Sequence, residues 1–254
     1  MGDITRVIAL GASNLTRGFY TVVLSARATW GPEVQVLAAH GHGRSYGAPS
    51  RVLARKTLPG IVESGLWRAL ESLPQVPTRA LVTDIGNDIL YGFPAGQILA
   101  WVEECLKRLQ RVTRDITLTD LPLESIQRLP QARYLAFRSI LFPFCRLSLD
   151  HVVKAAEQIS AGLKELSTAF GIRLFRLDPA WYGLDCVHIR PRYWLIAWQE
   201  ILCAGSTEGS VGRSLVEGLK LRLMAPERRW VLGFEQFTPQ SGVRLPSGGR
   251  IWLY

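Results

Sequence analysis

Short apolar runs that alternate with amphipathic segments are the feature of this sequence that most limits its fold. Each run ends at glycine or at polar turn residues and has the length of a buried strand. The predicted strands cover residues 6–10, 33–39, 79–88, 115–121 and 172–178, the third continuing into a loop. Helical spacing of apolar residues is found at 50–72, 94–112, 149–171 and about 191–203. This order favours an α/β fold with a mostly parallel, five-stranded sheet and helices on both faces.

Local signals refine several of these elements. Pro59 and Gly60 divide the helical pattern at 50–72, and Asp150 is a candidate N-cap for the helix at 149–171. Residues 122–143 are predicted to form a loop with a short helix. We divide the chain into a domain of residues 1–204 and a C-terminal extension of residues 205–254, β-rich or irregular and packed on the same domain.

Composition excludes several classes of protein. With 254 residues, 48% of them hydrophobic, the chain is long enough for one large core. No apolar leader precedes the first strand, and no apolar stretch reaches the roughly 20 residues that a bilayer crossing needs. The lysines and arginines behind the net charge of +9 are scattered, which is typical of a solvated surface rather than a nucleic-acid footprint.

The cysteines indicate a compartment. Cys105, Cys145, Cys186 and Cys203 are widely spaced and form no C-x-x-C pair. This spacing suits reduced core thiols better than a disulfide framework or a zinc site. We therefore expect a cytoplasmic protein without a bound metal.

Polar residues gather directly after the predicted strands. In a parallel sheet these positions meet at the carboxyl edge, where sites of α/β proteins form. The residues are Ser13 and Asn14 after the first strand, Gly41, His42, Gly43 and Arg44 after the second, Asp84, Gly86, Asn87 and Asp88 after the third, and Asp185 and His188 after the fifth.

Three of these residues have the chemistry needed to attack an acyl carbon. Ser13 supplies a hydroxyl at a helix N-terminus, His188 supplies a base, and Asp185 lies three residues before that histidine. Donors to an oxyanion are the N–H of Ser13, an N–H of the loop that contains Gly41 and Gly43, and the Asn87 amide. Between the two glycines we prefer Gly43, which lies deeper in the loop.

Each residue alone also has an ordinary structural interpretation. A serine before a helix is often an N-cap, and an Asn-Asp pair after a strand often forms a turn. The joint order favours the catalytic interpretation: serine after the first strand, glycine after the second, asparagine after the third, and aspartate with histidine after the last.

The stretches "GASNL", "DIGND" and "DCVH", with the glycine loop near residue 43, resemble the motif blocks of the SGNH hydrolases, also called GDSL-type esterases and lipases. The resemblance covers about Val7 to Cys203. It implies a flavodoxin-like three-layer α/β/α sandwich without a cofactor. Ser13 would be the nucleophile, His188 the base and Asp185 its orienter, with Ser13, Gly43 and Asn87 as the oxyanion donors.

Two positions depart from the family pattern. Its third block reads G-x-N-D, but here Ile85 takes the place of the glycine and Gly86 follows one residue later. The first block has Ala12 where the GDSL pattern has aspartate. Because Asn87 is present and Ala12 carries no hydroxyl chemistry, the expected roles are unchanged.

Other classes of protein fit the sequence less well. A dinucleotide-binding oxidoreductase would need a closer glycine than Gly18 after Gly11, and its short-chain family would need a tyrosine followed four residues later by lysine. The chain lacks G-K-[ST], and Leu15 replaces the second glycine of the G-x-S-x-G elbow. A non-catalytic SGNH-like module that binds a ligand or a partner is the other alternative, but it would have no need for the complete Ser, Asp and His set.

The sequence thus predicts a serine esterase or acyl hydrolase that works through an acyl-enzyme intermediate. The expected substrate is a small-molecule or carbohydrate-linked ester. Four residues are candidates for its pocket: Arg44, Tyr46, Trp181 and Tyr182. The arginine would bind a carboxylate or phosphate, and the aromatic rings a sugar face or an acyl chain, with plain packing as the alternative for the rings.

Overall fold

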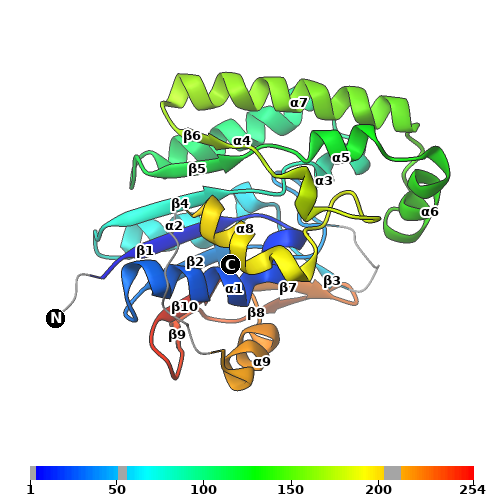
Figure 1. Ribbon diagram of the computed structural model, residues 1–254. Coiled ribbons are helices and arrows are strands. Elements are labelled where there is room, and N and C mark those ends of the chain that lie inside the picture. The colour runs from blue at the N-terminus through cyan, green and yellow to red at the C-terminus, as the bar shows by residue number, and fades with distance from the viewer. Residues whose placement is uncertain (1–3, 51–55, 203–212) are drawn as a thin grey trace.

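A central sheet of seven strands organises the computed structural model, which describes residues 4–50, 56–202 and 213–254 (Figure 1). The strand order is β6-β5-β4-β1-β2-β10-β9. Every pairing is parallel except that of β9 with β10. The strands are β1 (Arg6–Leu10), β2 (Gln35–Ala39), β4 (Thr78–Val82), β5 (Ile116–Thr119), β6 (Arg173–Phe175), β9 (Val243–Arg244) and β10 (Arg250–Leu253).

The five predicted strands are confirmed, and they lie side by side in the order expected of a flavodoxin-like sheet. The predicted sheet is nevertheless two strands too narrow, because β10 pairs with β2 and β9 pairs with β10. Residues 250–253 are too few to show a strand pattern, and their partner strand lies more than 200 residues earlier. We keep 1–204 and 205–254 as a proposed division of the chain, in which both parts contribute to one sheet.

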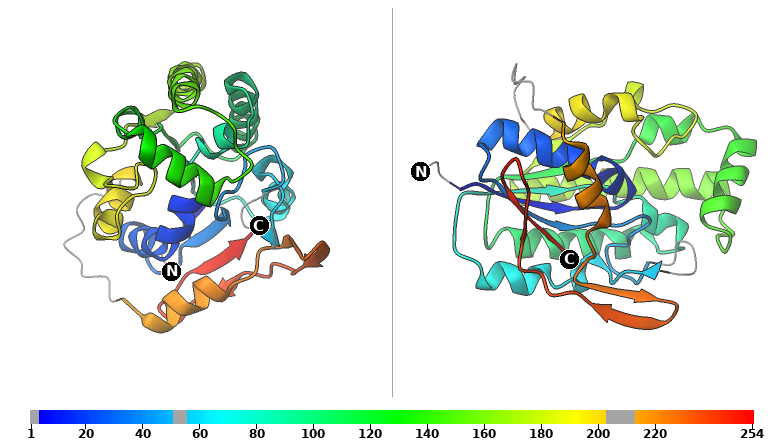
Figure 2. Two further views of the ribbon diagram at one scale, coloured as in Figure 1. Left: turned by 90° about the vertical axis from the view of Figure 1, so that its right-hand side faces the viewer. Right: turned by 90° about the horizontal axis from the view of Figure 1, so that it is seen from below.

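Helices cover both faces of the sheet (Figure 2). Side chains alternate along β1, so Val7 and Ala9 pack on one face while Ile8 and Leu10 pack on the other. The face of Val7 is covered by α1 (Ser13–Trp30), α8 (Trp194–Ile201) and α9 (Leu215–Leu223). The face of Ile8 is covered by α2 (Leu66–Ser72), α4 (Ala95–Leu109) and α7 (Leu149–Phe170). The predicted three-layer α/β/α sandwich is confirmed.

The helix expected at 50–72 is wrong in its first half. Residues 51–55 lie outside the described residues, and the chain after them forms the short strand β3 (Lys56–Thr57) and the 3-10 turn η1 (Ile61–Glu63) before α2. Gly60 explains the break, because a Cβ there would lie 2.7 Å from the backbone carbon of Gly47. The close approach of these two backbones has no room for a helix.

Three further boundaries differ from the sequence prediction. Two helices, α5 (Leu123–Gln127) and α6 (Gln131–Leu141), occupy the segment expected to hold one, with Pro130 between them. The N-cap of α7 is Ser148, whose hydroxyl accepts the N–H of His151, and not Asp150. The helix expected to reach Cys203 divides into the 3-10 turn η3 (Pro191–Tyr193) and α8, and Cys203 lies outside the described residues.

The C-terminal segment contains a helix in addition to strands. A hairpin of β7 (Arg228–Val231) and β8 (Phe234–Phe237) pairs with β3 to form a second sheet. Helix α9 is fastened to α1 by a buried ion pair in which Arg27 donates to both carboxylate oxygens of Glu217, at 3.1 and 2.7 Å. Among the described helices, none has the length and hydropathy required to cross a bilayer.

Candidate active site

The candidate site lies where the strand order of the sheet changes direction. Strand β1 lies between β2 and β4, so the loops after β1 and β4 diverge at the carboxyl edge of the sheet. Crevices of this kind are the usual binding sites of open α/β sheets. The loop after β1 leads directly into α1 at Ser13, and the loop after β4 leads into the short helix α3 (Asn87–Leu90).

Ser13, His188 and Asp185 form a continuous chain of hydrogen bonds. The Oγ of Ser13 lies 2.9 Å from Nε2 of His188, and Nδ1 of the same ring lies 2.6 Å from Oδ2 of Asp185. Ser13 is the first residue of α1, but the N-cap residue is Ala12 and no side chain caps the helix. The hydroxyl is therefore committed to the imidazole and not to capping.

The loop that carries His188 also holds Asp185 in its charged form. Burial raises the pKa of Asp185, but hydrogen bonds from the His188 ring and from the N–H groups of Val187 and His188 outweigh it, so the net pKa is lowered. These two N–H groups lie 3.2 and 3.1 Å from Oδ1, which leaves Oδ2 directed at the imidazole. Such a carboxylate can stabilise an imidazolium as it forms.

Asn14 and Asp84 connect the serine turn to the histidine loop. The amide of Asn14 donates to the carbonyl of Val187 and accepts the N–H of Ile189, both at 2.8 Å, so it contacts the residues on either side of His188. The same amide donates to Oδ1 of Asp84 at 2.8 Å. The other oxygen of Asp84 accepts the N–H groups of Ala12 and Leu15 at 2.9 and 3.0 Å. The brace formed by Asn14 and Asp84 thus sets the position of Ser13 relative to His188.

Asp84 also carries the unusual backbone conformation of this loop. Its φ is +62°, in the left-handed region that L-residues other than Asn and Asp rarely adopt. Gly86, the glycine displaced relative to the family pattern, has a φ of −71°. The loop therefore does not use Gly86 to reverse direction, and Ile85 fills the family's glycine position as a buried core side chain.

Two groups beside Ser13 have the properties of oxyanion donors. The Nδ2 of Asn87 is buried without a hydrogen-bond partner and lines the cavity next to the serine. Gly43 lines the same cavity with a φ of +61°, and the Tyr91 hydroxyl holds its carbonyl at 2.5 Å. Gly41 is not among the lining residues, and a Cβ there would collide with Leu58. The preference for Gly43 over Gly41 is consistent with this geometry.

A largely apolar cavity of about 370 Å³ opens beside the Ser13 hydroxyl. Its walls come from the loops after β1, β2, β4 and β6, from α5 to α7 and from the segments that connect these helices. Helix α6 covers the site, since the ring of Phe137 lies 6.4 Å from that of His188. The apolar lining includes Ile85, Ile89, Leu121, Ile126, Leu129, Tyr134, Phe142 and Val152.

Comparisons with known proteins agree with this architecture. No family model matches the chain, and no curated protein matches its sequence. The carbohydrate acetylesterase Est24 from Sinorhizobium meliloti matches with a TM-score of 0.53 at 13% identity, over 78% of this chain and 97% of its own. A member of the lipolytic protein G-D-S-L family from Veillonella parvula matches with a TM-score of 0.51 at 12% identity, over 81% and 100%. The chain has the fold of the SGNH hydrolases.

Within this SGNH-type fold, the structure brings together the predicted Ser13, Asp185, His188, Gly43 and Asn87. It does not bring the other predicted pocket residues to the cavity, with one exception. Tyr182 lines the cavity, and its buried hydroxyl has no hydrogen-bond partner among the described residues.

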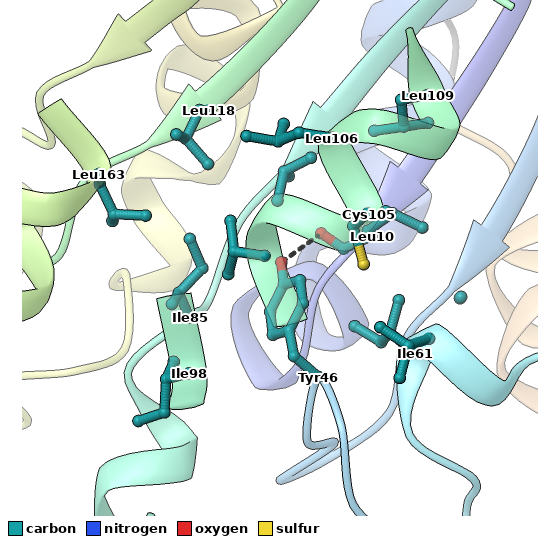
Figure 3. Packing of buried hydrophobic residues seen from close by; sticks show 14 of the residues in the cluster. Leu10, Tyr46, Ile61, Ile85, Ile98, Cys105, Leu106, Leu109, Leu118 and Leu163 are labelled. Atoms are coloured by element: carbon teal, nitrogen blue, oxygen red, sulfur yellow. Dashed lines mark hydrogen bonds between the residues drawn. The ribbon is translucent and has the colours of Figure 1, made fainter. Parts of the chain in front are cut away.

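Arg44, Tyr46 and Trp181 are buried structural residues and do not line the cavity, which corrects the prediction for all three. Arg44 donates to the carbonyls of three residues, Pro59, His40 and Tyr254. The Tyr46 hydroxyl donates to the carbonyl of Thr83 at 2.7 Å and points towards that of Leu10 (Figure 3). Trp181 stacks on Phe175 in the core at 6.0 Å. Loop residues beside a site face inward as readily as outward, and sequence position alone does not distinguish the two.

The brace and the cover were missed by the sequence analysis. Asn14 and Asp84 were noted only as polar loop residues, although an asparagine next to the candidate nucleophile is a usable signal. The hydrogen bonds from Asn14 reach 173 and 175 residues along the chain, which no local pattern encodes. Helix α6 belongs to the segment for which the sequence predicted only a loop and a short helix.

Proposed function

We propose that this protein is a serine esterase that cleaves an acyl ester through an acyl-enzyme intermediate. The observation that carries the proposal is the hydrogen bond of 2.9 Å between the Ser13 hydroxyl and His188, whose ring is bonded on its other side to Asp185. A nucleophile, a base and an orienting group in this geometry are the parts that acyl transfer requires.

In the first half of the reaction, the Ser13 oxygen attacks the ester carbonyl while Nε2 of His188 takes the hydroxyl proton. Asp185 stabilises the imidazolium through Nδ1. The negative charge on the former carbonyl oxygen is received by Asn87 Nδ2 and by the N–H groups of Ser13 and Gly43. When the tetrahedral intermediate collapses, His188 returns the proton to the leaving alcohol and the acyl group stays on Ser13.

In the second half, a water molecule takes the place of the alcohol. His188 removes one proton from the water as its oxygen attacks the acyl carbon, and the same donors hold the second oxyanion. Collapse releases the carboxylic acid, and the proton on His188 returns to the Ser13 oxygen. No step needs a group that the chain itself does not supply.

The cavity favours an apolar acyl chain over an acetyl group as the part of the substrate bound beside Ser13. Aliphatic and aromatic side chains make up most of its wall, and a small acetyl group would leave most of about 370 Å³ unfilled. Each methylene moved from water into such a site contributes about 0.8 kcal/mol. Tyr182 is the candidate polar contact among the lining residues, because its hydroxyl is buried and unpartnered.

A series of p-nitrophenyl esters from acetyl to dodecanoyl tests both parts of the proposal. We expect hydrolysis by the wild type and its loss in Ser13→Ala, with circular dichroism showing that the variant is folded. From acetyl to butyryl, kcat/KM should rise about tenfold or more if both added methylenes are buried. Equal inactivity of both proteins would favour a non-catalytic binding module, and a preference for acetyl esters would overturn the acyl-chain assignment alone.

Two finer points belong to this proposal. The cytoplasm is the compartment we propose, since Cys105, Cys145 and Cys186 are buried free thiols. We also propose that nucleic acid is not a partner, because the cationic side chains are distributed over the sequence.

A further inference from the structure

The segment from Ser125 to Leu149, which includes α6, has a charge pattern unlike the rest of the chain. It contains four arginines and no aspartate, glutamate or lysine, whereas the net charge of the whole chain is +9. The arginines are Arg128, Arg133, Arg138 and Arg146. In Figures 1 and 2 the segment extends from the body of the molecule at one end of α7.

Large apolar side chains on the outside of this segment are exposed. Ile140 has 74% of its surface exposed and Phe144 has 87%. On the inside of the same segment, Tyr134 and Phe142 are buried and line the cavity. The segment thus presents apolar residues both to the acyl cavity and to the solvent.

The arginines around these exposed side chains are available to a partner. Arg133 and Arg146 are exposed and take part in none of the ion pairs formed within the described parts of the chain. Arg138 stacks on Tyr134 and donates to the carbonyl of Leu147. A surface of this kind needs an occupant that is apolar and negatively charged.

A second copy of this chain does not meet that requirement. A two-fold contact would place the same segment of each copy face to face, because such contacts are self-complementary. Eight arginines would then meet without one acidic residue from either segment.

An anionic lipid surface meets both requirements. Isoleucine and phenylalanine side chains enter the boundary between head groups and acyl chains, while arginines bury their stems and keep their guanidinium groups at the level of the phosphates. We propose that residues 125–149 are a docking surface for anionic lipid. Docking there would place the covered cavity of the proposed esterase against the phase in which acyl esters dissolve; only this last point rests on the proposed function.

The test is co-sedimentation of the full chain with vesicles of phosphatidylcholine, with and without 30% phosphatidylglycerol. We expect binding to the anionic vesicles that weakens with added salt, and about tenfold weaker binding to the neutral ones. Ser13→Ala should bind as the wild type does, so a failure of the esterase proposal leaves this result unaffected.

Paired variants locate the surface. Ile140→Ser with Phe144→Ser, and separately Arg133→Gln with Arg146→Gln, should each weaken binding to anionic vesicles about tenfold or more. Leu219→Ser with Lys220→Gln on α9 is the matched control, since Leu219 is 58% exposed on another element and should leave binding unchanged. Thermal unfolding checks that all the variants fold.

Three outcomes would overturn the proposal: no vesicle binding, equal binding to neutral and anionic vesicles, or an equal loss in the α9 control. Size-exclusion chromatography supplies a fourth. If the wild type forms a dimer that Ile140→Ser with Phe144→Ser dissociates, the surface is covered by a second copy and not by lipid.

Discussion

Asn14 contacts the residues on both sides of His188, so a single amide next to Ser13 controls how the imidazole lies relative to the hydroxyl. The amide is fixed in turn by Asp84, whose carboxylate also holds the start of α1. Asp84 keeps a left-handed backbone at φ +62°, a conformation that costs of order 1–3 kcal/mol and persists only where its surroundings demand it. The strain of this loop therefore lies where three loops of the site are joined.

Replacing Asn14 by alanine should lower kcat more than it changes KM. The three groups that the amide now satisfies would lose their partner, and a shift of about 1 Å between reacting groups costs on the order of a hundredfold in rate. We expect a fall in kcat of about tenfold to a hundredfold, measured on a soluble p-nitrophenyl ester.

Thr16→Ala is the control for helix stability. The Thr16 hydroxyl donates to the carbonyl of Ala12 and contacts His40, on the same turn of α1 but away from the His188 loop. It should lower the unfolding temperature with kcat close to that of the wild type. Equal losses of kcat in the two variants would mean that the brace has no positioning role.

Asn87→Ala should separate catalysis from stability. Because Nδ2 of Asn87 is buried without a partner, its removal breaks no hydrogen bond in the resting protein. We expect kcat to fall by about a hundredfold or more, which is typical for loss of one oxyanion donor, with no decrease in unfolding temperature. Steady-state kinetics and calorimetry on the same preparation check both; turnover within twofold of the wild type would remove Asn87 from the mechanism.

At the scale of elements, helix α9 depends on one buried contact with α1. The side chains of Arg27 and Glu217 are 5% and 0% exposed, and Glu217 also accepts the N–H of Ser247 at 2.7 Å. One carboxylate therefore joins α1, α9 and the loop before β10. The amphipathic pattern of α9 alone does not indicate this contact, because its partner belongs to a helix almost 190 residues earlier.

Glu217→Ala should destabilise the fold by about 3–5 kcal/mol, because it leaves the Arg27 charge buried without a partner. Urea unfolding followed by tryptophan fluorescence measures the change. Glu235→Ala is the matched control, since Glu235 pairs with Arg228 at an exposed position and should cost less than about 1 kcal/mol. Similar losses in both variants would show that the buried pair is not what fastens α9.

At the scale of the whole molecule, the last strand is placed inside the central sheet. Strand β10 pairs with β2, and its side chains divide between the two helical layers, with Trp252 on one face and Ile251 on the other. Without β10, strand β2 would be an open edge, which is a template for aggregation. The sheet is complete only when the two ends of the chain have come together.

The pH dependence of folding is a second property of the whole molecule. Burial raises the pKa of Asp88 to about 6 from its ordinary 3.8, in spite of hydrogen bonds from Ser45 and the N–H of Tyr46. The folded state therefore binds this proton more tightly than the unfolded state. The contribution of Asp88 to stability is greatest below about pH 4, falls as the pH rises, and is fully lost above about pH 6.

Asp88→Asn should remove this fall. Relative to the variant, the wild type is expected to lose on the order of 2–3 kcal/mol of unfolding free energy between pH 4 and pH 7. Denaturant unfolding at a series of pH values gives the difference, and Asp150→Asn, at an exposed position of α7, is the control. A difference between wild type and Asp88→Asn that does not change with pH would contradict the raised pKa.

Local pattern was enough to predict the five inner strands, the main helices and the loops that carry Ser13, Asn87, Asp185 and His188. These features follow from periodicity and from turn residues, which act over a few positions. Once the strands are assigned, parallel pairing brings their carboxyl ends together without further information. The three-layer architecture was therefore available before any coordinates.

The tertiary structure alone decided which loop side chains reach the cavity. Arg44 and Tyr46 face the core because buried carbonyls there need donors, and Tyr182 faces the cavity because neighbouring segments leave space beside it. The brace of Asn14 and Asp84, the place of β10 and the cover formed by α6 likewise join residues far apart in the chain. Such contacts depend on the packing of the whole molecule, whereas periodicity reports only which face of an element is buried.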